Sequence, residues 1–459
     1  MERILLALCL VGLVLSSVAA QDASVRKEDG YRGIWYANQA SNDEYVWKYS
    51  GGLGTYTANH VPIAVYVPEV NKTFFVYGGS KPIDQTNRLL EMVSYYDHNT
   101  GTVPKPTLIR EKGTDDAHHN PALTIDKDGY LWVFCASHGG KDGFIYKSKS
   151  PYSIDGFELV MQREFSYPQI WYFDDFGFVF IFTKYTRGRE LYVSTSKDGI
   201  IWTPDQKYAG FDGHYQSSWK WGNKVGTSFN WHPPVGGLNA RTNLYYMETR
   251  DFGATWADAA GKKLDIPLSD HVNGALVRDY QKEGWLVYIN DVNYDREGNP
   301  MIFYNLSNGY ESGPAFGERV MMTARWTGVD WEYNEVTKTD HNYDMGSLYV
   351  EADGSWRVIA PTVGPQPWST GGEVGMWKSS DQGRTWRKIR NLTPNSEMNH
   401  HYVRRVLDAH PDFYAFWADG HAFKLSESSL YFSNRSGTAV RVLPEKMTRD
   451  NQKPRLRKR

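Results

Sequence analysis

Short runs of aromatic and β-branched residues alternate with turn-forming residues along most of this chain. Examples are KTFFVYGG at 72–79, YLWVFCAS at 130–137, FVFIFTKY at 178–185 and NLYYMET at 243–249, each with Gly, Asp or Ser at or near its end. Residues of these types, in runs of this length between turn formers, favour β-strands. Long segments with the 3.6-residue hydrophobic period of a helix do not occur in the sequence. The pattern therefore predicts an all-β protein.

The strand-like runs fall into seven similar units. They begin with HVPIAVYV, HNPALTID, YPQIWYFD, HYQSSWKW, HVNGALVR, YDMGSLYV and HYVRRVLD, at His60, His119, Tyr167, His214, His271, Tyr343 and His401. Successive starts are 59, 48, 47, 57, 72 and 58 residues apart, and a turn and a second strand follow each start, as in GYLWVFCAS. Units of this kind predict a seven-bladed β-propeller over residues 21–440. The 72-residue interval leaves room for an extra segment near residues 291–300.

A turn motif supports the same fold. Residues 249–256, TRDFGATW, and 379–386, SSDQGRTW, both fit S/T-x-D-x-G-x-T-W, and SKDGIIW at 196–202 is a shortened version. This is the Asp-box, expected between the third and fourth strands of a blade. Its Asp and Ser or Thr bond the turn backbone, its Gly adopts a positive φ, and its Trp packs between blades. The motif is expected to be structural and to lie far from any catalytic mouth.

Composition and charge narrow the setting. The 459 residues carry a formal net charge of -2, which gives no reason to expect a nucleic-acid or membrane partner, and the chain is expected to be monomeric. Residues 1–20 read as a secretory signal peptide, so the protein is expected to be secreted or periplasmic. Cys135 is the one cysteine outside that segment, and residues 441–459 form a basic tail expected to be disordered. The 15% aromatic content suits sheets and sugar binding.

The propeller topology predicts which polar residues meet. The entry of a blade's first strand and the exit of its second lie at the same mouth of the central channel. His118, His119 and Tyr167 stand at entries, His138, Lys184, Tyr185 and His232 stand at exits, and Arg241 opens a third strand at that end. His118 and His138 are thus expected to be neighbours across about one strand spacing. As alternatives, the histidines could cap strands, or they could bind a metal, although no tight H-x-H or H-x₃-H spacing supports a metal site.

At these residues the chain resembles the bacterial BNR-repeat propellers that include ulvan lyases. It resembles more closely the L-rhamnosyl-α-1,4-D-glucuronate lyases and the related α-L-rhamnosidases. The similar segments are GYRGIWYANQASNDEYVWKYSGGLGTY at 30–56, DDAHHNPALTIDKDGYLWVFCASHG at 115–139, SYPQIWY at 166–172, FTKYTRGRELYVSTSKDGIIW at 182–202 and GLNARTNLYYMETRDFGATW at 237–256.

The resemblance implies a lyase site made of His118, His138, Tyr167 and Arg241. Where the lyases carry an arginine after the tyrosine strand, this chain reads FTKYTRGR, with Lys184 nearest and Arg187 and Arg189 just beyond. The residues expected to catalyse are His118, His138 and Tyr167. Those expected to bind substrate are Arg241, Lys184, Arg187, His119, His232 and Tyr246. The rhamnosidase relatives use a histidine on the opposite face, for which His60 is the candidate.

The residue types also fit this chemistry without the resemblance. β-Elimination at a uronate needs a base for the C5 proton, a cation on the carboxylate and an acid for the leaving oxygen. Neutral His can be the base, Tyr can be the acid and Arg can pair the carboxylate. No metal or organic cofactor is required. The expected reaction is elimination in a uronate-containing glycan, arabinogalactan-type or ulvan-like, with release of L-rhamnose linked to D-glucuronate.

Other function classes remain open on the sequence. A hydrolase, such as an α-L-rhamnosidase on the same linkage, would need its own catalytic pair. Asp115 and Asp116 are adjacent and better suited to orienting His118 than to flanking a scissile bond. A sialidase would need an arginine triad and a Tyr–Glu pair, and its early arginine strand motif is missing. A glycan-binding propeller without catalysis would use the same aromatic mouth.

Overall fold

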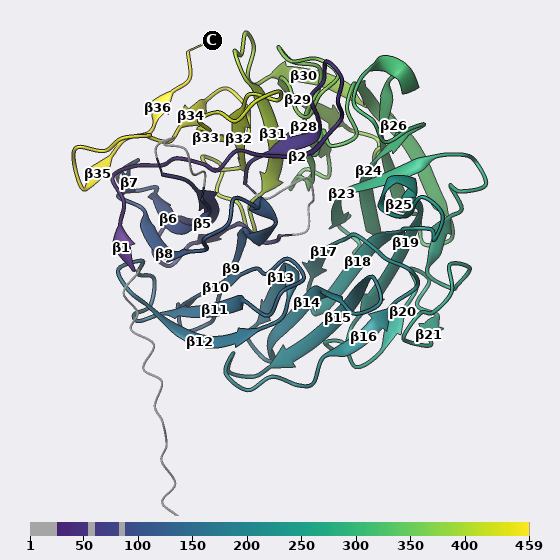
Figure 1. The fold of residues 1–459 in the computed structure, drawn as a ribbon. Coiled ribbons are helices and arrows are strands. Elements are labelled where there is room, and N and C mark those ends of the chain that lie inside the picture. The colour runs from purple at the N-terminus through teal and green to yellow at the C-terminus, as the bar shows by residue number, and fades with distance from the viewer. Residues whose placement is uncertain (1–24, 54–59, 82–87, 459) are drawn as a thin grey trace, which may run out of the picture.

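The computed structural model describes residues 25–53, 60–81 and 88–458, and the signal peptide expected at 1–20 lies outside them. Seven antiparallel sheets are arranged around a common axis, as Figure 1 shows. The chain passes from one sheet to the next in sequence order, and the first strand of each lies innermost. The predicted seven-bladed β-propeller is confirmed.

The first four blades contain these strands. Blade 1 has β4 (Ala64–Val67), β5 (Lys72–Gly79), β6 (Leu90–Asp97) and β8 (Thr107–Glu111), with β1 (Arg26–Lys27) at its edge. Blade 2 has β9 (Pro121–Ile125), β10 (Leu131–Cys135), β11 (Gly143–Ser148) and β12 (Phe157–Arg163). Blade 3 has β13 (Ser166–Phe173), β14 (Gly177–Tyr185), β15 (Arg189–Ser196) and β16 (Gln206–Ala209). Blade 4 has β17 (Gln216–Trp221), β18 (Lys224–Trp231), β19 (Thr242–Thr249), β20 (Trp256–Ala257), β21 (Lys263–Leu264) and β22 (Leu276–Arg278).

The last three blades complete the ring. Blade 5 has β23 (Leu286–Tyr294), β24 (Pro300–Ser307), β25 (Arg319–Trp326) and β26 (Trp331–Thr339). Blade 6 has β27 (Ser347–Val350), β28 (Trp356–Pro361), β29 (Val374–Ser379) and β30 (Arg387–Asn391). Blade 7 has β31 (Asn399–Arg405), β32 (Ala415–Gly420), β33 (Leu430–Ser433), β34 (Val440–Val442) and β36 (Arg455–Leu456). Two pairs stand apart: the hairpin of β2 (Tyr36–Ala40) with β3 (Trp47–Gly51), and β7 (Val103–Pro104) with β35 (Asn451–Gln452).

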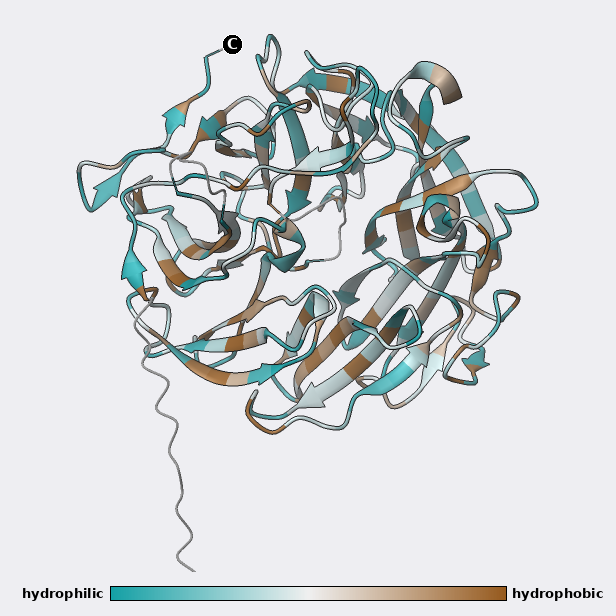
Figure 2. Ribbon diagram, viewed as in Figure 1, coloured by the Kyte–Doolittle hydropathy of each residue, from teal (hydrophilic) through white to brown (hydrophobic). Residues whose placement is uncertain are grey.

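The core lies between neighbouring sheets. Inner and middle strands such as β10, β18 and β24 are buried at every position, whereas the outer strands β12 and β30 are largely exposed. Figure 2 shows the corresponding hydrophobic bands on the strands that face adjacent blades. Helical structure is limited to the 3₁₀ turns η1 (Ala117–His119), η2 (Gly237–Ala240) and η3 (Pro314–Phe316). None of the helices in the described part of the chain could cross a membrane.

The Asp-box turns adopt the predicted structure. In blade 4 the turn joins β19 to β20, the third and fourth strands. There the Thr249 hydroxyl accepts the Gly253 N–H at 2.7 Å, and the Asp251 carboxylate accepts the Thr255 N–H at 2.8 Å. Gly253 has φ +97°, and Trp256 is buried against Tyr208 of blade 3. The turns at 196–202 and 379–386 occupy the same place in blades 3 and 6.

Three details differ from the sequence predictions, and the first is that residues 291–300, where an extra segment was expected, only end β23, turn and begin β24. The fifth blade starts at β23, so the run at His271 is an excursion of blade 4 whose strand β22 pairs with β19; His271 itself stacks on Trp231 at 4.5 Å. The run GWLVYIND at 284–291, which follows His271 and would be the second strand of that unit, is therefore part of the first strand of blade 5. The tail expected to be disordered from residue 441 instead holds β35 and β36. β35 pairs with β7, and β36 pairs with the edge strand β34. The backbone makes the hydrogen bonds of this pairing, so the basic side chains of the tail do not prevent it.

The ring closes through the N-terminal segment. The Gly33 N–H donates to the Ser428 carbonyl of blade 7 at 2.8 Å, and the Ile34 N–H donates to the Gly78 carbonyl of blade 1 at 2.8 Å. The hairpin β2–β3 then crosses one mouth of the channel, where Ser50 bonds Thr370 and the Trp47 carbonyl accepts from Ser312. Residues before the first blade thus both join blades 1 and 7 and contribute to the mouth.

Candidate active site

One carboxylate holds two histidines at the mouth beneath the hairpin. Asp116 caps the 3₁₀ turn η1, and its Oδ1 accepts the His118 backbone N–H at 2.9 Å. The same carboxylate lies 2.5 Å from His118 Nδ1 and 2.6 Å from His138 Nδ1. The two imidazoles stack with centroids 4.1 Å apart. The structure thus places His118 and His138 side by side, as the strand entry and exit predicted, and of the two adjacent aspartates it is Asp116 that bonds both rings.

The hydrogen-bonding directions follow from this arrangement. Because an ionised carboxylate can only accept, each Nδ1 donates its proton to Asp116 and each Nε2 carries a lone pair. These Nε2 atoms face phenols: Tyr167 OH lies 3.3 Å from His138 Nε2, and Tyr49 OH lies 3.4 Å from His118 Nε2. The site thus presents two imidazoles in the tautomer that can accept a proton.

A tyrosine relay continues from His138 to a cation. Tyr167 OH lies 3.0 Å from Tyr185 OH, which accepts from Arg189 Nε at 3.1 Å. Tyr185 and Arg189 are directly opposite each other in the β14–β15 register. Tyr167 sits at an irregularity between β13 and β14 with φ +53°, a conformation that non-glycine residues rarely adopt. Such local strain is typical of residues held for function.

Aromatic residues from several first strands line the inner end of the site. They form one cluster with Met345: Tyr49, Tyr167, Tyr215, Tyr288, Tyr343 and Tyr402. Arg241, which directly precedes β19, is buried among them. Its Nη2 donates to Tyr343 OH at 3.1 Å, and its guanidinium lies 4.6 Å from the Tyr288 ring and 5.0 Å from the Tyr215 ring.

Lys48 of the hairpin joins Arg241 and Arg189 to make the site cationic. Its amine donates to Asn239 Oδ1, and burial together with the charges of Arg241 and Arg189 lowers the pKa of Lys48 to about 7. Within the described residues, no carboxylate lies within ion-pair distance of Lys48 or Arg189. His232 is buried nearby, 4.9 Å from the Tyr215 ring, and burial beside Arg241 and Arg189 holds its pKa well below the usual value. A buried group of cations favours an anionic ligand.

Protonation states are consistent with base and acid roles. Burial opposes the effect of its two histidine partners, but these partners keep the pKa of Asp116 far below its ordinary value. Burial lowers the pKa of His118 to about 4, although Asp116 acts against it. Burial raises the pKa of Tyr167 well above its usual value, so the phenol stays protonated. His138 is the more accessible imidazole, with 24% of its side chain exposed against 3% for His118.

The predicted site residues separate into two groups in the structure. His118, His138, Tyr167, Arg241 and His232 are brought together. His119 lies at the edge, where its ring is 6.2 Å from that of His138 and its Nδ1 donates to the Ala136 carbonyl. His60 is buried beneath His118 and donates to its carbonyl at 3.1 Å, so it lies at this mouth and not on the opposite face.

Three residues expected to bind substrate lie elsewhere. Lys184 turns away from the mouth and pairs with Asp205 at 3.2 Å and Glu164 at 3.7 Å. Arg187 is exposed at the tip of the β14–β15 turn. Tyr246 lies farther along β19, where its hydroxyl donates to Glu248 at 2.7 Å in a buried cluster with Tyr294. The positions of Lys184 and Tyr246 on their strands, and of Arg187 in a turn, direct these side chains away from the histidines.

Several site residues were missed because they lie outside the repeating units. Lys48 and Tyr49 come from the hairpin, which precedes the first blade, as does Tyr36, whose ring lies 5.6 Å from that of His118. Arg189 lies close to Lys184 in sequence but is not among the residues that the sequence predicts to bind substrate. Strand alternation could have identified Arg189. Lys184 and Tyr185 are adjacent on β14 and must face opposite ways, and Arg189 lies opposite Tyr185 on the next strand.

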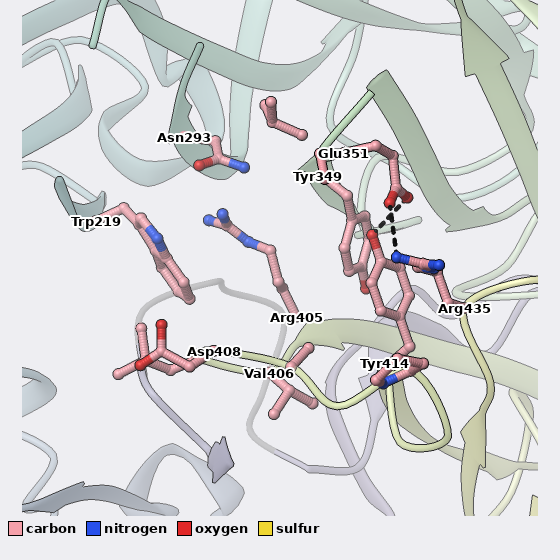
Figure 3. Close-up of a pocket in the computed structure, with 14 residues that line it drawn as sticks. Trp219, Asn293, Tyr349, Glu351, Arg405, Val406, Asp408, Tyr414 and Arg435 are labelled. Atoms are coloured by element: carbon pink, nitrogen blue, oxygen red, sulfur yellow. Dashed lines mark hydrogen bonds and ion pairs between the residues drawn. The ribbon is translucent and has the colours of Figure 1, made fainter. Parts of the chain in front are cut away.

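Two further features bear on the site, a possible metal-binding group and a hollow at the opposite mouth. Asp116, His118 and His138 are close enough to hold a metal ion, but both Asp116 oxygens are already engaged by the two Nδ1 atoms. A hollow of about 290 Å³ lies at the far ends of the first strands, lined by residues such as Trp219, Tyr349, Arg405 and Asp408. In Figure 3 the Glu351 carboxylate of this opposite mouth lies against Arg435 and the Tyr414 hydroxyl.

The fold and site together define a seven-bladed β-propeller with Asp-box turns and a His–Tyr–Arg site at one mouth. The chain belongs to the BNR repeat-containing family, whose profile matches residues 85–339.

Relatives with known names support the placement. The chain is 23% identical over 428 residues to an ulvan lyase of Nonlabens ulvanivorans, covering 82% of this chain and 86% of the relative. It is 22% identical over 407 residues to a PL25 ulvan lyase of Pseudoalteromonas sp. (strain PLSV), covering 78% and 81%. A solved PL25 ulvan lyase has a TM-score of 0.69 at 17% identity, with coverage of 89% and 96%. The polysaccharide lyase Uly1 has a TM-score of 0.61 at 12% identity, with coverage of 89% and 99%.

Proposed function

We propose that this protein is a polysaccharide lyase that cleaves a uronate-containing glycan by β-elimination. The observation that carries the proposal is the Asp116 carboxylate, which holds two histidines with their Nε2 atoms toward tyrosines, beside Arg189 and Arg241. The names of the relatives support it, and one solved PL25 ulvan lyase is described as bound to -[GlcA(1-4)Rha3S]-.

The geometry suits a closed proton cycle. His138 Nε2 takes the C5 proton of the uronate, the electron pair forms the C4–C5 double bond, and the C4–O bond breaks. Tyr167 gives its proton to the leaving oxygen and regains one from protonated His138, 3.3 Å away. Net transfer is one proton from C5 to the leaving group. Asp116 stabilises the imidazolium that forms, as a charged partner of Nδ1. His118 is the alternative base, but it is more deeply buried.

The cations serve the same reaction. Removal of the C5 proton moves negative charge onto the uronate carboxylate, and preorganised guanidinium groups stabilise that charge where it develops. Arg241 is fixed by Tyr343 and the Leu238 carbonyl, and Arg189 by Tyr185, so neither must reorganise. Lys48 adds a third positive group from the hairpin.

The substrate and location form the finer part of the proposal. The site is proposed to act where L-rhamnose is linked to D-glucuronate, in an arabinogalactan-type or ulvan-like glycan. The protein is proposed to be secreted through the segment at 1–20. A hydrolase on the same linkage is the second candidate, but Asp116, with both oxygens bonded to histidine, is poorly placed to act as a glycosidase carboxylate.

Ultraviolet absorbance distinguishes the candidates. Elimination creates a double bond conjugated to the carboxylate, which absorbs ultraviolet light, whereas hydrolysis does not. The protein is incubated with rhamnose-capped arabinogalactan and, separately, with ulvan, and absorbance and released rhamnose are followed together. Absorbance that rises on either glycan supports the lyase. Rhamnose without absorbance indicates a hydrolase, and binding without either product indicates a glycan-binding propeller.

A further inference from the structure

A second group of metal-ligating side chains lies outside the candidate active site, where the first and last blades meet. His98 is in the turn after β6 of blade 1, and His410 and Asp412 are in the turn between β31 and β32 of blade 7. The two imidazole centroids are 3.8 Å apart. One ligand atom of each residue lies within 4.8 Å of the others. Residues more than 300 positions apart in sequence thus converge on one point.

The hydrogen bonding of His98 prepares one nitrogen for a ligand. Its Nε2 lies 2.9 Å from the Thr73 hydroxyl, while its Nδ1 is buried and has no hydrogen-bond partner. When Nε2–H donates to Thr73, Nδ1 carries a lone pair that nothing in the described residues uses. Metal-binding histidines usually donate the N–H of one ring nitrogen to a second group, which leaves the lone pair of the other nitrogen for the metal. In His98 these nitrogens are Nε2 and Nδ1. Left without a partner, the buried nitrogen costs stability.

The other two residues complement it. His410 Nδ1 accepts the Asp412 backbone N–H at 3.1 Å, so in the neutral ring this nitrogen carries the lone pair and is the ligand atom, and a bound ion would replace that hydrogen bond. Asp412 is exposed and supplies a carboxylate at the outer side, which leaves a path for an ion to enter. Tyr66 packs on both imidazoles, at 5.4 Å and 5.0 Å, and limits their rotation.

We propose that His98, His410 and Asp412 bind one divalent transition metal ion that links blade 1 to blade 7. Two imidazoles and one carboxylate suit Zn²⁺ best, with water in the fourth position. Ligand atoms around one tetrahedral Zn²⁺ are roughly 3.3 Å apart, so small side-chain rotations bring these three into place. The proposal does not depend on the activity, because the ion would lie away from Asp116 and its histidines.

An ion here would strengthen the closure of the ring. Blades 1 and 7 already meet through the Tyr66 N–H, which donates to the Leu407 carbonyl, and through Gly33. Because opening of a propeller must separate its first and last blades, a ligand that binds only the closed ring raises the melting temperature with its concentration.

The test uses the full-length protein after treatment with a chelator. Zinc chloride is titrated calorimetrically, and melting temperature is measured with and without zinc. The wild type is expected to bind one ion per chain at this site and to melt higher with zinc. His410→Gln and Asp412→Asn should melt like the wild type in chelator but lose the rise with zinc. Thr73→Val, which removes only the group that orients His98, should weaken zinc binding by roughly 10–100-fold.

Two control variants keep the test specific. His271→Gln changes a partly exposed histidine in blade 4 and should bind zinc like the wild type. His138→Gln removes one ligand from the other group that could bind a metal ion, Asp116, His118 and His138. No zinc binding by the wild type would overturn the proposal, as would unchanged binding in both His410→Gln and Asp412→Asn. Loss of binding in His138→Gln alone would place the ion at the candidate active site and would also overturn it.

Discussion

The charged groups at the two mouths of this propeller have different partners. At the mouth opposite the histidines, the charged groups satisfy one another: Arg405 pairs with Asp291 at 3.1 Å, and Glu351 pairs with Arg357 at 2.7 Å and accepts from Tyr414 at 2.8 Å. Figure 3 shows Glu351 between Tyr414 and a second cation, Arg435. At the histidine mouth, Lys48 and Arg189 have no carboxylate within ion-pair distance among the described residues, and Arg241 is buried among tyrosines.

The difference teaches where an anion would be bound. A buried cation is costly to desolvate, and a mutual ion pair offsets that cost within the protein itself. At the opposite mouth, Arg405 and Glu351 already have such partners, so these groups are less available to a charged ligand. The histidine mouth brings Arg189 and Arg241 close enough to Lys48 to lower its pKa, and their combined charge would stabilise an anionic ligand. Both mouths contain aromatic and charged residues, so composition alone would not separate them.

The largest effect is expected when the shared carboxylate is neutralised. Asp116→Asn should lower kcat by roughly 10³-fold, because the amide can accept from only one imidazole and leaves the other tautomer unfixed. Initial rates of ultraviolet absorbance on the active glycan measure the change. Asp115→Asn is the matched control, since Asp115 is the exposed neighbour, and it should be near wild type. Equal losses in both variants would mean that Asp116 does not organise the site.

Exchanging a cation at each mouth tests the comparison directly. Arg241→Ala should lower kcat/KM by about 100-fold, because a preorganised cation is removed from the developing charge. Arg241→Ala should lower the melting temperature much less than a substitution that breaks a buried ion pair.

Arg405→Ala at the other mouth should do the reverse. It leaves Asp291 buried without its partner, a cost of about 3–5 kcal/mol in the free energy of unfolding, while activity per folded molecule stays near wild type. Paired measurements of melting and kcat/KM on both variants decide the point. Parallel losses of stability and activity in Arg241→Ala would make Arg241 a structural residue.

A smaller effect is expected from Lys48 and should depend on pH. Because burial and Arg241 lower its pKa to about 7, the amine is charged below that pH and neutral above it. If the charge helps to bind the substrate anion, kcat/KM of the wild type should fall on the alkaline side, by about tenfold in all. Lys48→Arg keeps its charge and should move this alkaline limb to higher pH. An identical pH profile in both proteins would remove Lys48 from substrate binding.

The fold was predictable because its signals are repeated. Seven strand-rich units and the Asp-box turns each report on the same architecture, so an error in one unit, such as the fifth start at His271, leaves the blade count unchanged. The pairing of His118 with His138 was also predictable, since it follows from strand entry and exit within one blade.

The rest of the site could not be predicted for a physical reason. Tyr49 and Lys48 reach the histidines only because the hairpin β2–β3 crosses the mouth, where it contacts loops of distant blades. Nothing in the local pattern of residues 36–51 specifies those tertiary contacts. Arg189 is different, because its position could have been derived from its register opposite Tyr185.

The smallest effect is expected from Lys184 and Arg187, the two cations that the sequence predicted to bind substrate because they follow the strand of Tyr167. Lys184 follows Thr183 and precedes Tyr185 on β14, and successive side chains of a strand point to opposite faces. Since Tyr185 contacts Tyr167, Lys184 must face the other way, where it pairs with Asp205. Lys184→Ala and Arg187→Ala should therefore change kcat/KM by less than about threefold, as expected for surface charges. Arg189→Ala, only two residues beyond Arg187, should lower it by about 100-fold because it removes the cation that anchors the tyrosine relay. A loss in Lys184→Ala as large as that in Arg189→Ala would show that the cation of this strand acts from the other face, and the division between the two mouths would have to be redrawn.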